Sequence, residues 1–323
     1  MIIQKSIKRT LNHFQSDLRQ LLRNRVFLKK TGFAYYNFWQ NGEIEDTWFY
    51  RFLQRPALQH LNKQKTIGVY SVFGRRRIIK LSHPGLKIFL SGENLRNHPS
   101  YFDYGGKDIH LSLGFDHSSE AKRHLRFPLW LIDCFPPDAT LETIKDLLYQ
   151  WEQRRLNVKH RIPGATLIAR HDTNGQRSII GDIASQHLSV IYPGPFRRNV
   201  AQELKGYEEK LAYIGQYPFN ICPENTNAEG YVTEKLFHAM MAGCIPVYWG
   251  ADNCPEPDII NPKAIVFYDP LRPEKLSKEI QYLSQDENTL ASWSDQPYFL
   301  QNAASYIYDF YLQLENKIED LHK

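Results

Sequence analysis

The sequence predicts an α/β protein with two domains, each built on a parallel, doubly wound sheet. Short β-rich runs alternate with helical or loop segments of crossover length along most of the chain, a pattern typical of parallel sheets. The 323 residues, 42% of them hydrophobic, exceed the usual size of a single domain and can fill a substantial core. We therefore expect two domains, with a ligand in the cleft between them.

A basic segment occupies residues 1–30, ahead of the first domain. Asp17 is its only acid. Its basic residues are Lys5, Lys8, Arg9, Arg19, Arg23, Arg25, Lys29 and Lys30. Apolar residues recur at helical spacing in the same stretch, at Leu11, Phe14, Leu18, Leu21 and Leu22. The pattern fits either a basic amphipathic helix lying on an anionic membrane surface, or a helix packed on the first domain with a solvated basic face.

The two domains are expected at residues 31–155 and 156–300. The predicted strands of the first are 65–73, 86–92 and 108–116, followed by a helix at 141–155. The predicted strands of the second are 165–170, 188–192, 219–223, 245–249 and 264–269. The last segment, 301–323, carries an aromatic stripe at helical spacing, so we expect a helix with a buried face and the first domain as its candidate partner.

The sequence gives no sign of a membrane span, a leader or a nucleic-acid partner. No apolar run approaches the roughly 20 residues that cross a bilayer. The N-terminus lacks the apolar core and small-residue cleavage site of a signal peptide, so we expect a cytoplasmic protein, either free or peripheral on the inner membrane face. The net charge of +5 comes without a nucleic-acid-binding motif, so no such partner is expected.

Neither a metal site nor a disulfide is predicted. The four cysteines form no CxxC pair, and three of them lie in or beside apolar runs, where buried thiols are common. They are Cys134, Cys222, Cys244 and Cys254. His110, His117 and His124 recur every seven residues, but their segment has the pattern of a strand followed by a loop, not of one helix face. We interpret this spacing as coincidence.

The stretch 219–250, FNICPENTNAEGYVTEKLFHAMMAGCIPVYWG, carries the candidate site. A strand leads through a polar loop to Thr233, an apolar helix follows, Gly243 ends it, and a second strand returns. Ligands of open α/β sheets collect beyond the carboxyl ends of strands, where a helix start offers free N–H groups to an anion. Lys235 is locally unfavourable in a first helical turn, and a bound diphosphate would offset that conflict. Glu234 has a structural alternative, because acids favour helix starts.

Part of this stretch, PENTNAEGYVTEKLFHAMMAGCIPVYWG, resembles the donor-binding signature of glycosyltransferase family 10, the α-1,3/4-fucosyltransferases. Motifs of the first domain follow the family's order, and the resemblance covers residues 31–269. These motifs are Asn37-Phe38-Trp39, Ser71-Val72-Phe73-Gly74, Ser91-Gly92-Glu93-Asn94, Gly114-Phe115-Asp116 and Leu125-Arg126-Phe127-Pro128-Leu129. Glu224 and Glu234 have nine residues between them, against seven in the paired acids of retaining nucleotide-sugar enzymes, which argues against a retaining mechanism.

The resemblance implies a GT-B fold, with two Rossmann-like domains facing a cleft, and an inverting transfer from GDP-β-L-fucose without an obligatory metal or other cofactor. It places a group of residues around GDP-fucose, with Lys235 on the diphosphate and Glu234 near the fucose hydroxyls or the ribose. The group is Asn225, Tyr231, Glu234 and Lys235. It also suggests Arg177 as a second diphosphate ligand, although His171-Asp172 replace the family's usual Ser-Asn before this arginine.

Two further groups of basic residues bear on which residues bind the ligands. Arg198 lies in a second basic loop and is a rival to Arg177, with a solvated loop charge as the alternative. The run 75–77 consists of three arginines after a strand of the first domain, and we interpret it as surface charge or as contacts to the acceptor.

The resemblance makes Glu93 the catalytic base, and the structural alternative is an exposed turn acid. The implied function is α-1,3-fucosyl transfer to N-acetylglucosamine of a lactosamine-type glycan or of a surface polysaccharide. Two alternatives stay open: a GT-B enzyme using another nucleotide sugar, and a catalytically inactive glycan-binding relative.

Overall fold

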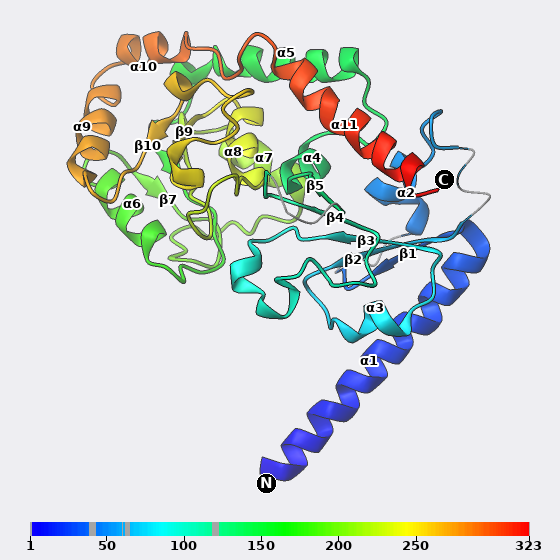
Figure 1. Cartoon of the computed structure of the whole chain (residues 1–323). Coiled ribbons are helices and arrows are strands. Elements are labelled where there is room, and N and C mark those ends of the chain that lie inside the picture. The colour runs from blue at the N-terminus through cyan, green and yellow to red at the C-terminus, as the bar shows by residue number, and fades with distance from the viewer. Residues whose placement is uncertain (1, 39–42, 60, 62–64, 118–122, 323) are drawn as a thin grey trace. The chain divides into compact units, whose positions relative to one another are not determined.

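The computed structural model describes residues 2–38, 43–59, 61, 65–117 and 123–322, with side chains from residue 12 onward apart from that of residue 159 (Figure 1). Trp39 of the first-domain motifs therefore lies outside the described residues. The chain forms two compact units. The first comprises residues 1–127, 136–138 and 311–323, and the second comprises residues 128–135 and 139–310.

The first unit is built on a five-stranded parallel sheet whose strands follow their order in the sequence. The strands are β1 (Phe33–Tyr36), β2 (Ile67–Ser71), β3 (Leu86–Leu90), β4 (Leu111–Gly114) and β5 (His124–Arg126). The helices are α1 (Ile2–Thr31), η1 (Ile44–Asp46), α2 (Trp48–Phe52), α3 (Arg77–Leu81), η3 (Leu95–Asn97) and η4 (Pro99–Tyr101). The predicted strands β2, β3 and β4 are confirmed, and the sheet gains an edge strand on each side.

Both faces of the first sheet are covered, because successive side chains of a strand point to opposite faces. Ala34 and Tyr36 of β1 belong to a buried cluster that Leu21 and Leu28 of α1 pack against. On the other face, Tyr35 packs its ring against Phe49 of α2. Residues at the end of the chain complete this second face: the ring of Tyr311 packs against those of Trp48, Phe52 and Phe127.

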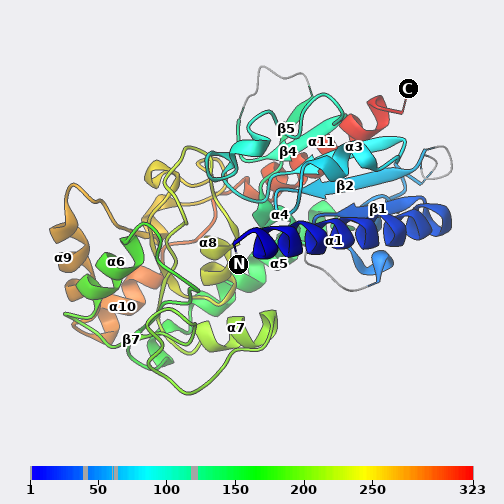
Figure 2. The same ribbon diagram turned by 90° about the horizontal axis from the view of Figure 1, so that it is seen from below.

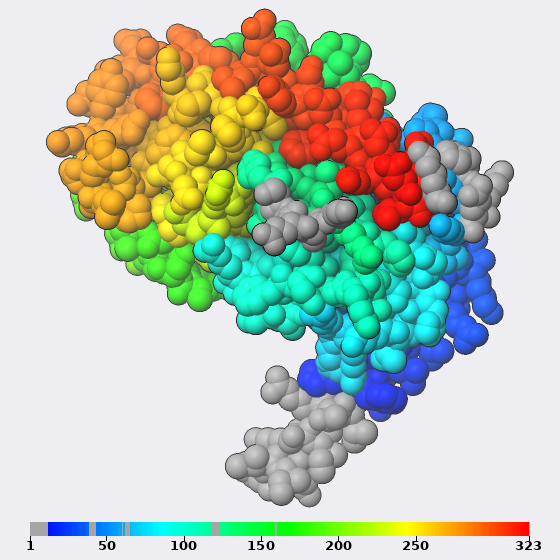
Figure 3. Space-filling view, viewed as in Figure 1, coloured from blue at the N-terminus to red at the C-terminus, as the bar shows by residue number. Residues whose placement is uncertain are grey.

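The second half of α1 is part of the first unit. Asn24 is fully buried and donates to the carbonyl oxygen of Tyr35 at 2.6 Å, while Asp17 pairs with both Arg75 and Arg77. Figure 2 shows α1 running alongside β1, and Figure 3 shows its described residues against the neighbouring α3. The packed-helix alternative is therefore confirmed for this half. On the outer side of the helix the apolar residues Phe14, Leu18, Leu22 and Val26 are 45–62% exposed.

The second unit is built on another five-stranded parallel sheet, with the order β10-β9-β8-β6-β7. Its strands are β6 (Ala165–Thr166), β7 (Val190–Ile191), β8 (Phe219–Ile221), β9 (Ile245–Tyr248) and β10 (Val266–Phe267). All five lie in the predicted runs. The winding reverses here, because β6 pairs with β7 on one side and with β8 on the other. Sheets of this order bind ligands at the carboxyl ends of the two strands that flank the reversal, β6 and β8.

Helices cover both faces of the second sheet. The helices of the second unit are α4 (Leu129–Cys134), α5 (Leu141–Arg155), η5 (Val158–His160), α6 (Gln176–Ala184), α7 (Tyr207–Ile214), α8 (Glu234–Met241), η6 (Ala251–Asn253), η7 (Pro262–Ala264), α9 (Pro273–Leu283) and α10 (Glu287–Ser294). The last helix, α11 (Ala303–Asp320), begins in this unit. Phe219 and Ile221 share a buried cluster with residues of α6 and α9. On the opposite face, α8 contacts α4, α5 and α7. The α/β fold class with two parallel sheets is thus confirmed.

The expected domain limits differ from the compact units at three helices. Helix α4 lies in the second unit, although residues 31–155 were expected to form the first domain. Helix α5 matches its predicted bounds, 141–155, but lies in the second unit and not in the first. Helix α11 has its residues up to 310 in the second unit and the rest in the first, where Glu315 pairs with Arg55. The expected division into domains at residues 31–155 and 156–300 therefore stays a prediction. No helix in the described part of the chain is both long and apolar enough to span a membrane.

Candidate functional site

A pocket lies where the reversed winding predicts one, at the carboxyl ends of β6 and β8. Its lining combines residues that follow these two strands with the beginnings of α6 and α8 and the inner side of α7. The lining residues are Leu167, Ile168, Arg177, Lys210, Ile214, Asn220, Ile221, Cys222, Pro223, Lys235 and His238. Three of them, Arg177, Lys210 and Lys235, carry cationic groups. A strongly basic wall at this point of a parallel sheet suits an anionic ligand.

A buried carboxylate just after β8 organises the start of α8. Glu224 accepts hydrogen bonds from the backbone N–H and the hydroxyl of Thr233, both at 2.7 Å. The ammonium of Lys235 lies 2.9 Å from Glu224 Oε2 and 3.2 Å from the hydroxyl oxygen of Thr233. Because an ammonium has three N–H donors, these two contacts leave a third for a ligand in the pocket.

This carboxylate changes the interpretation of Lys235. Burial would lower the pKa of its ammonium, but the charges of Glu224 and Glu234 outweigh that effect and raise the pKa above its ordinary value. The cation that is unfavourable at a helix start is therefore compensated within the protein, so its presence there does not by itself require a bound diphosphate. Its side chain is still 20% exposed and lines the pocket.

Arg177, in the first turn of α6, reaches toward the same pocket. Its Nη2 donates to Asn225 Oδ1 at 2.6 Å, and its Nη1 donates to the carbonyl oxygen of His171. Asp172 accepts from the backbone N–H groups of Arg177 and Ser178 at 3.1 and 2.8 Å, which fixes the start of this helix. Asp172, one of the two residues that depart from the family pattern, thus satisfies two backbone donors at the start of α6, and the guanidinium of Arg177 still lines the pocket.

The other predicted donor residues are placed differently. Glu234 is half-buried; burial raises the pKa of its carboxyl, but Lys235, Lys210 and His238 outweigh this and lower it overall. Asn225 contacts Arg177 and does not itself line the pocket. Tyr231 is 1% exposed and also lies outside the lining, so its role as a donor ligand stays a prediction.

The remaining basic clusters are engaged elsewhere. Arg198 is exposed and pairs with Glu203 at 2.8 Å, away from the pocket lining. In the first unit, Arg75 and Arg77 pair with Asp17 of α1, and Arg76 pairs with Asp103. All three therefore have intramolecular partners in this structure.

Glu93 lies at the carboxyl end of β3, in the turn where the sequence predicts it. Gly92 takes the left-handed conformation with φ of 55°, a region that glycine adopts more readily than other residues. Asn94 then caps η3 by accepting from the N–H of Arg96 at 3.0 Å. The side chain of Glu93 is half-buried. The strand, the glycine and the cap together define the backbone turn from which this side chain extends.

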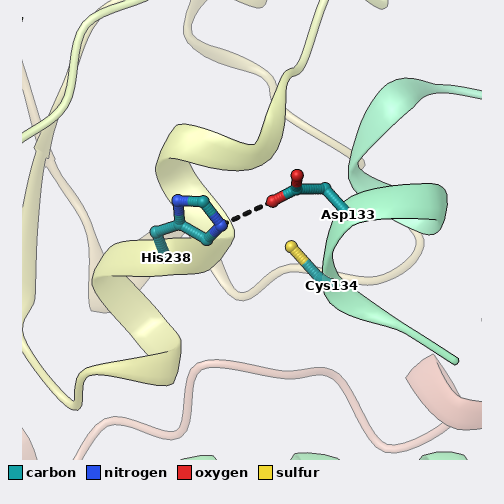
Figure 4. Close-up of side chains that lie close together, drawn as sticks. All are labelled: Asp133, Cys134 and His238. Atoms are coloured by element: carbon teal, nitrogen blue, oxygen red, sulfur yellow. Dashed lines mark hydrogen bonds and ion pairs between the residues drawn. The ribbon is translucent and has the colours of Figure 1, made fainter. Parts of the chain in front are cut away.

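One group of potential metal ligands occurs in the described part of the chain: Asp133, Cys134 and His238 (Figure 4). His238 Nδ1 lies 2.8 Å from Lys210 Nζ, and its Nε2 lies 2.7 Å from Asp133 Oδ2. Since an ammonium only donates, Nδ1 accepts and Nε2 carries the proton that goes to Asp133. Burial also raises the pKa of the Cys134 thiol well above its usual value, which keeps it protonated. These residues fit a hydrogen-bond chain better than a cation site.

Among the residues that the structure describes, the other histidines and cysteines form no further group of potential metal ligands. The N–H of Lys87 donates to His110, and His124 lies 2.9 Å from the hydroxyl of Ser112. Cys134, Cys222 and Cys244 are buried as predicted, and all four thiols are free.

Three of the residues at this site are not predicted as functional from the sequence: Glu224, Lys210 and His238. In the sequence Glu224 stands out only through its spacing to Glu234, and Lys210 does not stand out, because a lysine in the helical stretch YEEKLAYI carries no signal of its own. The packing of α7 beside α8 brings Lys210 to the pocket.

The family model described as the FucT N-terminal domain of α-(1,3)-fucosyltransferase matches residues 33–133, and the one described as the C-terminal part of glycosyltransferase family 10 (fucosyltransferase) matches residues 159–299. The α-(1,3)-fucosyltransferase FucT of Helicobacter pylori is 25% identical over 306 residues, covering 82% of this chain and 62% of that protein. An α-(1,4)-fucosyltransferase of Arabidopsis thaliana is 39% identical over 124 residues, covering 38% of this chain and 30% of that protein.

A crystal structure of an α1,3-fucosyltransferase with GDP-fucose superposes with a TM-score of 0.56 at 19% identity, covering 88% of this chain and 89% of that one. The same match to a structure with GDP has a TM-score of 0.57 at 20% identity. These likenesses confirm the GT-B class of fold. With both halves of the chain matched, the protein belongs to glycosyltransferase family 10.

Proposed function

We propose that the protein is an inverting α-1,3-fucosyltransferase that transfers L-fucose from GDP-β-L-fucose to N-acetylglucosamine of a lactosamine-type glycan or of a surface polysaccharide. The observation that carries the proposal is the basic pocket at the ends of β6 and β8, which contains Arg177 and Lys235 in a chain of this family. The chain covers less than two thirds of the length of the curated relatives described above, so its activity is proposed and not inherited from them.

In this proposal the diphosphate of GDP-fucose binds to the guanidinium of Arg177 and to the remaining N–H of Lys235. Both cations are held by intramolecular contacts before the ligand arrives, Lys235 by Glu224 and Arg177 by Asn225. A cation that is already fixed loses little conformational entropy on binding. The same charges stabilise the phosphate oxygen that gains negative charge as the bond to fucose breaks. Glu234 binds the fucose hydroxyls or the ribose, and Asn225 and Tyr231 complete the surroundings of the donor.

Glu93 acts as the general base. Its carboxylate accepts the proton of the acceptor hydroxyl while that oxygen forms a bond to the anomeric carbon of fucose. In the same step, the bond from this carbon to the β-phosphate oxygen breaks and GDP leaves. A single displacement from one side and departure from the other inverts the anomeric centre. The positioned turn after β3 supports this role, because a base must be held within hydrogen-bonding distance of the hydroxyl it deprotonates.

The proposal also includes contact with a membrane through the exposed side of α1. Its exposed apolar residues lie among arginines and lysines, a combination that suits the surface of an anionic bilayer. We propose that the protein binds peripherally to such a surface through these residues, while the second half of α1 remains packed on the first sheet.

Turnover with different donors tests the function. The purified protein is incubated with a lactosamine acceptor and, in turn, GDP-fucose, GDP-mannose, UDP-galactose and UDP-N-acetylglucosamine, and the products are identified by mass spectrometry. We expect a product only with GDP-fucose, carrying one added deoxyhexose. Transfer from another sugar nucleotide at an equal or higher rate contradicts the donor assignment. Tight binding of the acceptor without any transfer would instead favour the inactive glycan-binding relative.

A further inference from the structure

Lys210 is a third cation at the pocket, on an element that the family signature does not include. It lies in the first turn of α7 and lines the pocket together with Arg177 and Lys235. A lysine on an exposed helix face normally extends its ammonium into water, where it is strongly hydrated. The ammonium of Lys210 instead contacts the ring of His238, a residue that is 2% exposed.

The partner of Lys210 is neutral. No carboxylate in the described ranges forms an ion pair with this ammonium, in contrast to Lys235, which has Glu224. His238 Nδ1 accepts one of the three N–H donors of Lys210, so two donors and the full positive charge are available to a ligand. Glu234 is coupled to these cations: burial would raise the pKa of its carboxyl, but the charges of Lys235 and Lys210 oppose that effect, and its pKa is lowered overall.

His238 is itself held in one orientation. Its Nε2–H donates to Asp133 Oδ2 at 2.7 Å, and the ring of Tyr207 packs edge-on against it with 5.0 Å between centroids. The chain Asp133, His238, Lys210 thus links α4 through α8 to α7. Each member fixes the next, and the last one ends at the pocket (Figure 4 shows the first link).

We propose that Lys210 binds the diphosphate of the nucleotide as a third cation, and that His238, oriented by Asp133, is a positioning residue for it. The proposal rests on the proposed function in one respect: the ligand is taken to be a nucleoside diphosphate. It goes beyond that function by assigning a phosphate contact to α7. Arg177 and Lys235 approach the pocket from α6 and α8, so Lys210 adds a cation from a third helix.

Binding of GDP and GMP to Lys210 variants tests the assignment by isothermal titration calorimetry. Replacing Lys210 by Met keeps the length of the side chain and removes its charge. We expect the Kd for GDP to rise about tenfold to a hundredfold, the usual size of a lost charged hydrogen bond, and the Kd for GMP to change much less. Lys210→Arg should restore part of the affinity for GDP. The matched control is Lys205→Met, at an exposed lysine five residues earlier that does not line the pocket, and it should bind GDP like the unmodified protein.

The positioning role of His238 is tested by a double-mutant cycle. His238→Phe removes the acceptor for the Lys210 ammonium and should weaken GDP binding in the same direction as Lys210→Met. We expect the double variant to bind GDP no more weakly than Lys210→Met alone, because both changes remove the same contact. His238→Gln, which can accept one hydrogen bond and donate another, should retain more affinity than His238→Phe. Thermal unfolding of each variant identifies any that fail to fold. Additive losses in folded variants would overturn the positioning role.

The outcomes separate this inference from the proposed function. Equal losses for GDP and GMP in Lys210→Met, or an equal loss in Lys205→Met, overturn the diphosphate contact. If the unmodified protein binds UDP and not GDP, the GDP-fucose assignment fails, and the same variants tested with UDP and UMP decide the role of Lys210. If the unmodified protein binds neither nucleotide nor inorganic pyrophosphate, the diphosphate contact is overturned outright.

Discussion

The ammonium of Lys235 lies 2.9 Å from a carboxylate oxygen of Glu224 whose side chain is completely buried. Glu224 follows β8 and Lys235 opens α8, so this pair spans the polar loop of the family signature from both ends. The same carboxylate accepts two hydrogen bonds from Thr233. Its oxygens thus receive three donors, and this contact keeps the ammonium of Lys235 at the pocket wall.

Glu224→Gln should lower the free energy of unfolding by about 3 kcal/mol, since removing one charge of a buried pair leaves the other uncompensated. Urea unfolding followed by circular dichroism measures this. The control is Glu229→Gln, at an exposed acid of the same loop. Combining Glu224→Gln with Lys235→Met should recover part of the loss, because no buried charge then lacks its partner. A change no larger than that of the control would mean that the pair contributes nothing to folding.

Arg177→Gln should weaken GDP binding by about tenfold to a hundredfold, because a guanidinium that contacts two phosphate oxygens forms charge-assisted hydrogen bonds that glutamine cannot replace. Arg198→Gln is the matched change at the rival arginine, and its exposed pair with Glu203 predicts no effect on GDP binding. Fluorescence titration with GDP decides between the two. The reverse order of effects would move the diphosphate site to the loop of Arg198.

Most strands of both sheets were predictable, because their β-rich runs are bounded by glycine or polar turns. The two missed strands have physical explanations. β1 follows a thirty-residue helix with only Gly32 between them, so its four residues have no preceding loop to mark them. β5 is the tripeptide His124–Arg126, with two polar residues, and becomes a strand only through its pairing with β4.

The site residues that lie close together in the sequence were predictable. Those that the fold brings together from distant positions were not. Lys235 and Glu234 belong to one sequence signature, and the strand, loop and helix around them could be predicted from the residues. The contact between Arg177 and Asn225, 48 positions apart, depends on the pairing of β6 with β8, and the contact between Lys210 and His238 depends on the packing of α7 beside α8. The burial of Tyr231 could likewise not be anticipated, since its position in the loop is polar in character.

Replacing Phe14, Leu18 and Leu22 by serine should reduce binding to vesicles that contain anionic lipid, because these exposed side chains are the ones free to enter the interface. Cosedimentation with vesicles of phosphatidylcholine and phosphatidylserine measures the affinity, and pure phosphatidylcholine vesicles show the part that depends on charge. Substitution is a better test than truncation at Lys30, which would also remove Asn24 and Asp17 from their contacts with the first unit. Unchanged affinity in the triple variant would exclude this surface as the membrane contact.

Glu93→Gln should lower turnover by about 10²–10⁴, the usual contribution of a positioned general base. A carboxylate is too weak a base to ionise a sugar hydroxyl beforehand, so the proton must move while the new bond to the anomeric carbon forms. Loss of the base therefore raises the energy of the transition state and leaves the ground state nearly unchanged.

The same variant should bind GDP with the affinity of the unmodified protein, because Glu93 belongs to the first unit and the basic pocket to the second. Lys235→Ala is the complementary change: it should weaken GDP binding and leave the base in place, so the pair of variants separates chemistry from binding. The test is the initial rate of fucose transfer at saturating acceptor, together with the Kd for GDP of each variant. If Glu93→Gln transfers fucose at a near-normal rate, another acid is the base. Asp116, which follows β4 and accepts a hydrogen bond from the hydroxyl of Tyr104 at 2.7 Å, would be the next residue to substitute; Glu120, the other candidate, lies outside the described residues.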